Sequence, residues 1–158
     1  MEVIKDTLVL GLGNLLMQDE GAGVEVIRWL EGQKIPENAE LVDGGTGGFH
    51  LLGFIQSYKT IIFIDASLDE HPAGHVRVLQ PRYAKDFPKH LSAHEIGLKD
   101  LLDSAILLGN MPKLHLVAIS VTDFQDMGMD LSPEVAAAVP VVVERVREMV
   151  ELRVTNDK

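Results

Sequence analysis

Apolar residues follow two spacings along this chain: short continuous runs, and longer stretches in which they recur every third or fourth position. Short apolar runs bounded by glycine, proline or polar turns are typical of strands, and the longer spacing is typical of helices. Strands are therefore predicted at residues 7–10, 39–42, 60–64, 75–79 and 114–121. Helices are predicted at residues 21–32, 49–58, 92–108 and 132–152.

The order of these elements, β-α-β-α-β-β-α-β-α, predicts an α/β fold. The strand at 60–64 is a continuous apolar run, as in strands covered on both faces of a parallel sheet. Residues 66–74 are too few for a helical crossover, so strand 75–79 is expected to run antiparallel to the third strand and to be half exposed. We predict one domain, residues 1–158 with a frayed end at 154–158, forming a three-layer α/β/α sandwich. Its five-stranded sheet is mostly parallel, with the fourth strand antiparallel.

Turn and cap residues set the expected helix boundaries. Ser92 and Glu95 have the spacing of a capping box, in which serine begins a helix and a glutamate bonds back to it. Gly109 is typical of the residue that follows a helix. In the last helix Pro133 suits the first turn, whereas Pro140 predicts a kink. In the first helix, apolar residues recur at helical spacing at Val24, Ile27, Trp29 and Leu30.

The segment 8–23 contains a strand, a glycine turn and the start of a helix. Asp19 and Glu20 lie where that helix begins, and a helix N-terminus stabilises carboxylates. The glycines of this turn begin a dinucleotide fingerprint, but Leu16 occupies the place of its third glycine, and the lysine of a P-loop is missing. Because carboxylates would also repel a phosphate, a cation suits this turn better.

The composition of the chain bears on its partners, its chemistry and its location. The chain carries 24 acidic and 14 basic residues, for a net charge of −10, which disfavours nucleic acid and anionic membranes. It has no cysteine, which excludes disulfides, thiolate nucleophiles and thiolate metal ligands. It shows no secretory leader and no apolar run near the ~20 residues of a membrane span, so the cytoplasm is the expected location.

Side chains that could hold a metal follow the predicted strands at one edge of the sheet. Ligands of open α/β sheets bind beyond the carboxyl ends of the strands, and the acidic pair, Asp43 and Asp65 all lie there. His94 lies in the first turn of a helix, whose N-terminus favours the neutral, metal-binding imidazole. Each residue also has an ordinary explanation: Asp43 fits an Asx-turn, Asp65 a turn cap, and His94 an exposed surface position.

Two carboxylates and an imidazole suit a divalent ion such as Ni²⁺, Zn²⁺ or Mn²⁺. Other hydrolytic chemistry has less support. His94 does not begin an H-E-x-x-H motif, because the residue four positions later is Leu98. No serine occupies a G-x-S-x-G elbow. A metal-assisted reaction is therefore the hydrolytic route that remains.

Four stretches of the sequence, spanning most of the domain, resemble the [NiFe]-hydrogenase maturation endopeptidases. They are LGLGNLLMQDEGAGV at 10–24, LVDGGTGG at 41–48, IIFIDAS at 61–67 and SAHEIGLKDLL at 92–102, in the family's order and spacing. The resemblance implies a cytoplasmic hydrolase, a protease that removes a C-terminal extension from the hydrogenase large subunit after nickel insertion. Its implied partner is the large-subunit precursor, and we expect a monomer with no nucleic-acid or membrane partner.

The resemblance also implies roles for individual residues. By motif match, Glu20, Asp65 and His94 would contact nickel carried by the precursor, which another divalent ion could replace in vitro. Asp43 matches a position that the family needs for activity and is the candidate catalytic residue. The loop at 122–131 either selects between hydrogenase partners or packs on the core. Two other functions stay open from the residues alone, a small-molecule metallohydrolase and a non-enzymatic nickel-binding accessory protein.

Overall fold

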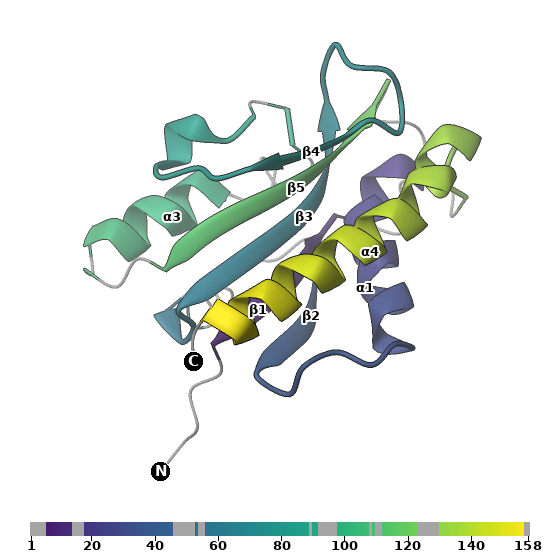
Figure 1. Ribbon diagram of the computed structural model, residues 1–158. Coiled ribbons are helices and arrows are strands. Elements are labelled where there is room, and N and C mark those ends of the chain that lie inside the picture. Colours follow the sequence, from purple (N-terminus) through teal and green to yellow (C-terminus); the bar gives the residue numbers. More distant parts are fainter. Residues whose placement is uncertain are drawn as a thin grey trace.

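The computed structural model describes residues 6–13, 18–45, 53, 56–88, 90–91, 98–107, 109, 112–122 and 130–156; of residues 18, 20, 45, 84, 98–101 and 152–156 it describes only the backbone. A five-stranded sheet with the order β2-β1-β3-β5-β4 forms its centre (Figure 1). The strands are β1 Thr7–Leu12, β2 Ala39–Gly45, β3 Thr60–Leu68, β4 Val76–Leu79 and β5 Lys113–Val121. The predicted α/β fold with a mostly parallel sheet is confirmed.

The strand β4 is the antiparallel member of the sheet. It pairs with β5, from Val76 opposite Ile119 to Leu79 opposite Leu116, and β5 is parallel to β3. The predicted direction relative to the third strand is therefore right. However, β5 lies between β3 and β4, so β4 bonds to a strand that comes later in the chain. All four β4 residues are half-buried, as predicted.

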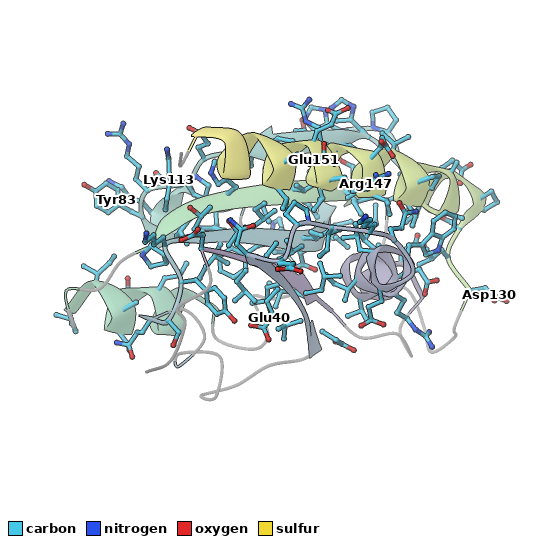
Figure 2. All side chains as sticks on the ribbon, turned by 60° about the horizontal axis from the view of Figure 1, so that its bottom comes forward. Glu40, Tyr83, Lys113, Asp130, Arg147 and Glu151 are labelled. Atoms are coloured by element: carbon cyan, nitrogen blue, oxygen red, sulfur yellow. The ribbon has the colours of Figure 1, made fainter. Side chains whose placement is uncertain are left out.

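Successive side chains along the strands point to opposite faces of the sheet, so the sheet has a hydrophobic core on each face. In β3, Ile62 and Ile64 pack in a cluster with α1 (Ala22–Glu31) and α4 (Pro133–Asn156). Ile61 and Phe63 pack in a second cluster with α3 (Leu98–Leu107). Figure 1 shows α1 and α4 beside each other on one face of the sheet and α3 on the other. Side chains fill the space on both faces of the sheet (Figure 2). Because both faces are covered, β3 is buried along almost its whole length, as its apolar run predicted.

Three strands continue beyond their predicted ends, to Leu12 in β1, Gly45 in β2 and Leu68 in β3. The predictions ended where polar residues or glycines began, but backbone pairing does not depend on the side chain. Asp65 and Ser67 therefore continue the ladder with β5. Asp65 is an interior strand residue, and its interpretation as a turn cap is wrong.

The glycine and proline residues that were expected at helix boundaries lie at the observed ends of α3 and α4. Gly109 has φ +80° and donates its N–H to the Ile106 carbonyl at 3.1 Å, which confirms the predicted end of α3. The last helix begins at Pro133, as predicted, and continues through Pro140 as a single helix. Two short 3-10 turns, η1 Gln18–Gly21 and η2 Ala84–Asp86, precede α1 and α3. Among the described residues, no helix combines the length and hydropathy needed to span a bilayer.

Two predicted features lie largely outside the described residues. Of the helix at 49–58 the structure describes Gly53 and Gln56 as helical, and Ser57 Oγ donates to the Gly53 carbonyl at 2.7 Å. The capping box at 92–95 is outside the described residues.

The first helix buries Val24, Ile27 and Leu30, but Trp29 is 46% exposed. Trp29 stands two positions after Ile27, which is nearly the opposite side of a helix, and Val26 completes the buried stripe instead. The apolar residues that recur at helical spacing therefore do not all share the buried face of α1.

Close backbone contact fixes the start of α1 against the sheet. Gly23 lies so near the carbonyl oxygens of Leu12 and Ile64 that any side chain there would overlap both. A side chain at Gly11 would likewise overlap the Gly23 backbone. These contacts hold η1 and the first turn of α1 at the carboxyl ends of β1 and β3.

Replacing Gly23 by alanine should lower the free energy of unfolding by at least about 2 kcal/mol, because the added methyl group must push α1 away from two backbone oxygens. Urea unfolding monitored by circular dichroism measures this loss. Gly32→Ala is the matched control, since the nearest atom to its new methyl group would be the Trp29 carbonyl oxygen at 3.7 Å. Equal stability of the two variants would contradict the close contact.

Candidate active site

Asp65 is buried in the interior of β3, on the face of the sheet that α3 covers. Strand alternation aligns it with Ile61 and Phe63, two residues of the α3-side core. Its Oδ1 atom accepts a hydrogen bond from the Ala66 N–H at 2.8 Å. A carboxylate is costly to bury unless it is paired, hydrogen-bonded or bound to a metal. A buried acid at the carboxyl end of a central strand is therefore a candidate functional group.

Glu20 lies in η1, immediately before α1. The contact between Gly23 and the Ile64 carbonyl sets η1 beside the residue that precedes Asp65. The structure thus brings the backbone of Glu20 to the same end of β3 as Asp65, as the sequence predicted.

His94 lies outside the described residues, but the segment that leads to it is bonded to the same end of β3. Leu91 forms an antiparallel bridge with Ser67, and the Leu68 N–H donates to the His90 carbonyl at 2.9 Å. Since β1 pairs with β3 only as far as Ile64, this edge of β3 is open to residues 90–91. Leu91 stands three positions before His94 in the chain.

Asp43 points to a different face of the sheet. In β2 it alternates with Gly44, whose position faces Leu10 and therefore the α3 side. Asp43 is exposed and shares its face with Leu41, which packs on the α1-side core. The structure therefore brings Asp43 to the carboxyl edge of the sheet, but on the opposite face from Asp65. Among the described side chains, no group of three His, Asp or Glu lies close enough to hold a metal ion, and that set includes neither Glu20 nor His94.

Asp19 is buried and holds two parts of the fold together. Its Oδ1 accepts the Ser132 backbone N–H at 2.7 Å, and its Oδ2 accepts the Ser132 hydroxyl at 2.9 Å. Ser132 directly precedes Pro133, the first residue of α4, so the carboxylate lies at a helix N-terminus, where the dipole favours it. The prediction that a helix N-terminus stabilises the Asp19 carboxylate is right, but that helix is α4 and not α1. Of the two acidic neighbours, Glu20 is therefore the candidate for chemistry.

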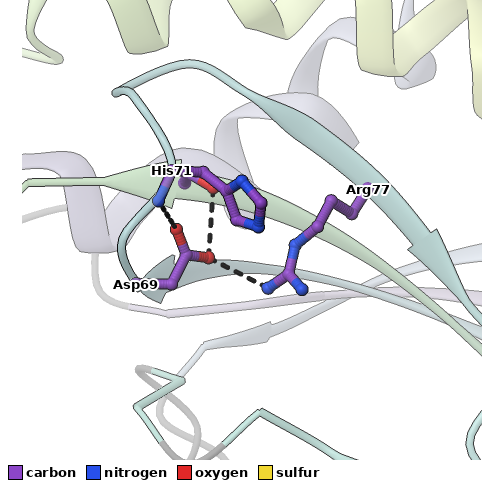
Figure 3. A network of polar contacts seen from close by, with 4 residues as sticks. Asp69, His71 and Arg77 are labelled. Carbon is purple, nitrogen blue, oxygen red and sulfur yellow. Dashed lines mark hydrogen bonds and ion pairs between the residues drawn. The ribbon is translucent and has the colours of Figure 1, made fainter.

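A polar cluster around Asp69, shown in Figure 3, was missed by the sequence analysis. The carboxylate follows β3 and accepts hydrogen bonds from the His71 N–H at 2.9 Å, the Arg77 guanidinium at 3.0 Å and the Ser120 hydroxyl at 3.1 Å. Arg77 lies in β4 and Ser120 in β5, so Asp69, just past the end of β3, joins three strands. In the alternating strand HVRVL, Arg77 takes the polar position between Val76 and Val78, so the local pattern gave no signal of this cluster.

Comparison with known proteins identifies the family. A profile of hydrogenase maturation proteases matches residues 24–149. A hydrogenase expression/formation protein of Rhodobacter capsulatus is 34% identical over 147 residues, covering 90% of this chain and 70% of that protein. The hydrogenase 2 maturation protease of Escherichia coli is 34% identical over 143 residues, covering 88% and 87%. The chain belongs to the hydrogenase maturation protease family.

Solved structures agree with this assignment. The hydrogenase maturating endopeptidase HybD of Escherichia coli superposes with a TM-score of 0.85 at 31% identity, over 94% of this chain and 93% of that one. The [NiFe] hydrogenase maturation protease HybD of Thermococcus kodakarensis gives a TM-score of 0.75 at 27% identity, over 92% and 99%. The protein is therefore a hydrolase of the protease class, and neither the metallohydrolase nor the accessory-protein alternative gains support.

The surroundings of Asp69 determine its charge in this protease. Burial alone would raise the pKa of the Asp69 carboxyl, but the His71 N–H, the Ser120 hydroxyl and the Arg77 charge together hold that pKa below its ordinary value. The Ser67 hydroxyl also lowers the pKa by proximity, although Ser67 Oγ is buried without a well-formed hydrogen bond to any described residue.

Asp69→Asn should lower stability at pH 7 by about 1–3 kcal/mol, the usual cost of losing hydrogen bonds to a charged group. Because the folded-state pKa is depressed, the carboxylate stabilises the fold above about pH 4 and loses that contribution as pH falls through the folded-state pKa. The variant should therefore lose less stability than the wild type on acidification. Urea unfolding at several pH values measures this, with the exposed Asp103→Asn as control. Parallel pH profiles would contradict it.

Asp19→Ala should also cost about 1–3 kcal/mol, because the Ser132 N–H loses its charged acceptor. Denaturant unfolding of Asp19→Ala and the exposed control Glu31→Ala gives the difference. A stability equal to that of the control would show that the carboxylate does not anchor α4.

Proposed function

We propose that this protease acts as a monomer in the cytoplasm and removes the C-terminal extension of a [NiFe]-hydrogenase large-subunit precursor after nickel insertion. The observation that carries the proposal is that three chain segments meet at the carboxyl end of β3. These are η1 with Glu20, β3 itself with Asp65, and the segment 90–91 that leads to His94. The resemblance of their motifs to the family supports the same three residues as nickel contacts.

Nickel in this proposal is part of the substrate. The precursor's own ligands hold the ion, and Glu20, Asp65 and His94 offer carboxylate oxygens and an imidazole nitrogen, which suit a divalent ion of this kind. A precursor without nickel lacks that contact, so its scissile bond is not positioned. Positioning of this kind accounts for large factors in rate.

Asp43 is the candidate catalytic residue, and its position favours contact with the peptide over contact with the metal. It lies on β2, the strand at one edge of the sheet, and it is exposed. The edge strand of a sheet can bind an extended peptide through backbone hydrogen bonds, while neighbouring side chains recognise the side chains of the peptide. We therefore propose that Asp43 acts on the chain to be cut, from the opposite face to Asp65.

Alanine at Glu20 or His94, and asparagine at Asp65, should each reduce processing at least about 100-fold while leaving the fold intact, because each change removes a nickel contact that positions the precursor. Mass spectrometry of a precursor incubated with each variant measures the shortened product. Glu31→Gln, an exposed acid at the end of α1, is the control.

The precursor is tested with and without nickel. Cleavage of both forms at equal rates would contradict nickel recognition, and full processing by one variant would reject that residue as a contact. Binding of the nickel-loaded precursor without shortening would contradict proteolysis.

A further inference from the structure

A groove of about 430 Å³ lies between α1 and α4. One wall is formed by Glu25 and Trp29, which are four positions apart on α1 and so lie on one side of that helix. The other wall is formed by Ala136 and Val139 on α4, and Asp130 and Leu131 close one end. Figure 2 shows Asp130 beyond the start of α4, near α1.

The interior of the groove is formed by apolar side chains, and some of these side chains are partly exposed to solvent. Trp29 is 46% exposed although α1 buries its other large apolar side chains. Ala136 is exposed and small, which leaves space opposite the indole, and Leu131 is half-buried. Aromatic side chains that are partly exposed in a concave site are typical anchors of protein–protein interfaces.

The rim of the groove is acidic. Asp130 is exposed, and Glu25 is only loosely paired, with its carboxylate 3.8 Å from the Arg28 guanidinium. The whole chain carries a net charge of −10. An apolar groove with an acidic rim therefore complements a segment that presents an apolar side chain next to lysine or arginine.

The end of the groove is linked to η1 through the Asp19 carboxylate. Leu131 lies at one end of the groove. The next residue, Ser132, donates hydrogen bonds to the Asp19 carboxylate from both its N–H and its hydroxyl. Asp19 in turn precedes Glu20. One end of the groove is therefore bonded to η1, the turn that carries Glu20.

We propose that this groove binds a segment of the hydrogenase precursor in which an apolar residue lies beside a basic residue. This inference rests on the proposed function. It adds a second contact, away from the cut bond, whose role is to hold the precursor and not to carry out the chemistry.

Filling the groove tests the proposal with little risk to the fold. Ala136→Phe inserts a ring between the two walls and should raise KM for the nickel-loaded precursor about tenfold or more, with kcat nearly unchanged. Ala137→Phe is the matched control, because Ala137 is the next residue of α4, is also exposed, and does not line the groove. The control should keep the wild-type KM.

Two further pairs of variants separate the apolar and the charged contributions. Trp29→Ala should raise KM, whereas Tyr83→Ala should not, since Tyr83 is 54% exposed and lies at the far end of the molecule from Asp130 (Figure 2). Glu25→Lys should raise KM, whereas Glu148→Lys, which breaks a comparable pair with Arg145, should not. Rising salt should weaken binding by the wild type more than by Glu25→Lys.

A direct measurement uses the single tryptophan of the chain. Protease labelled with 5-fluorotryptophan gives one ¹⁹F signal, from position 29, and that signal should shift when unlabelled precursor is added. The shift should be absent in Ala136→Phe. If Ala136→Phe proves unfolded by circular dichroism, Trp29→Ala decides the kinetic test.

The outcomes separate this inference from the proposed function. Normal cleavage by wild type and by all groove variants, with unchanged KM and no ¹⁹F shift, would overturn the groove and leave the proteolysis intact. A wild-type protein that does not cleave the precursor would overturn both. A concentration-dependent ¹⁹F shift without precursor, abolished by Ala136→Phe, would assign the groove to a second copy of this chain and overturn the proposal.

Discussion

The close contact between Gly23 and the carbonyl of Ile64 is the constraint on which the placement of the site depends. It allows a helix to begin directly above the end of a central parallel strand, with backbone against backbone. The turn η1 that precedes the helix, with the backbone of Glu20, is then held at the end of β3. A side chain at position 23 would move α1 outward and separate Glu20 from the strand that carries Asp65.

Two other sets of hydrogen bonds hold segments of the chain at this end of the sheet, and each involves β3 or a segment in contact with it. The bridge between Leu91 and Ser67 attaches the chain before His94 to the edge that β1 leaves open. The bonds from Ser132 to Asp19 attach the start of α4 to η1. The candidate contacts therefore come from separate segments, but their supports converge on one strand end. This is how a small domain can place ligands from distant parts of the chain without disulfides.

The sequence predicts the fold where local patterns decide it. The apolar run of the third strand indicates cover on both faces, and Gly109 and Pro133 mark helix ends that the structure confirms. The partner of β4 could not be predicted in this way, because that choice depends on where β5 inserts. The exposure of Trp29 could not be predicted either, because the spacing of four apolar residues does not define a single helix face.

The candidate site could be predicted only in outline. The carboxyl-edge rule predicts the end of β3 to which the structure brings Asp65 and the backbone of Glu20, because the rule depends on strand direction alone. It could not separate Asp19 from Glu20, since the partner of Asp19 lies 113 positions away. It placed Asp43 at the right edge but could not give its face, which depends on how far β2 continues. The Asp69 cluster joins three strands through contacts that no local pattern contains.

The sheet order has a consequence for when activity can arise. β1 lies between β2 and β3, and β3 lies between β1 and β5, so the centre of the sheet is built from segments far apart in the chain. Pairings of that kind require long loops to close and form late in folding. The end of β3 becomes a site only after β5, near the end of the chain, has joined the sheet. A nascent or partly folded chain thus lacks the complete end of β3 at which the candidate residues lie, and we expect no proteolysis before the sheet is complete.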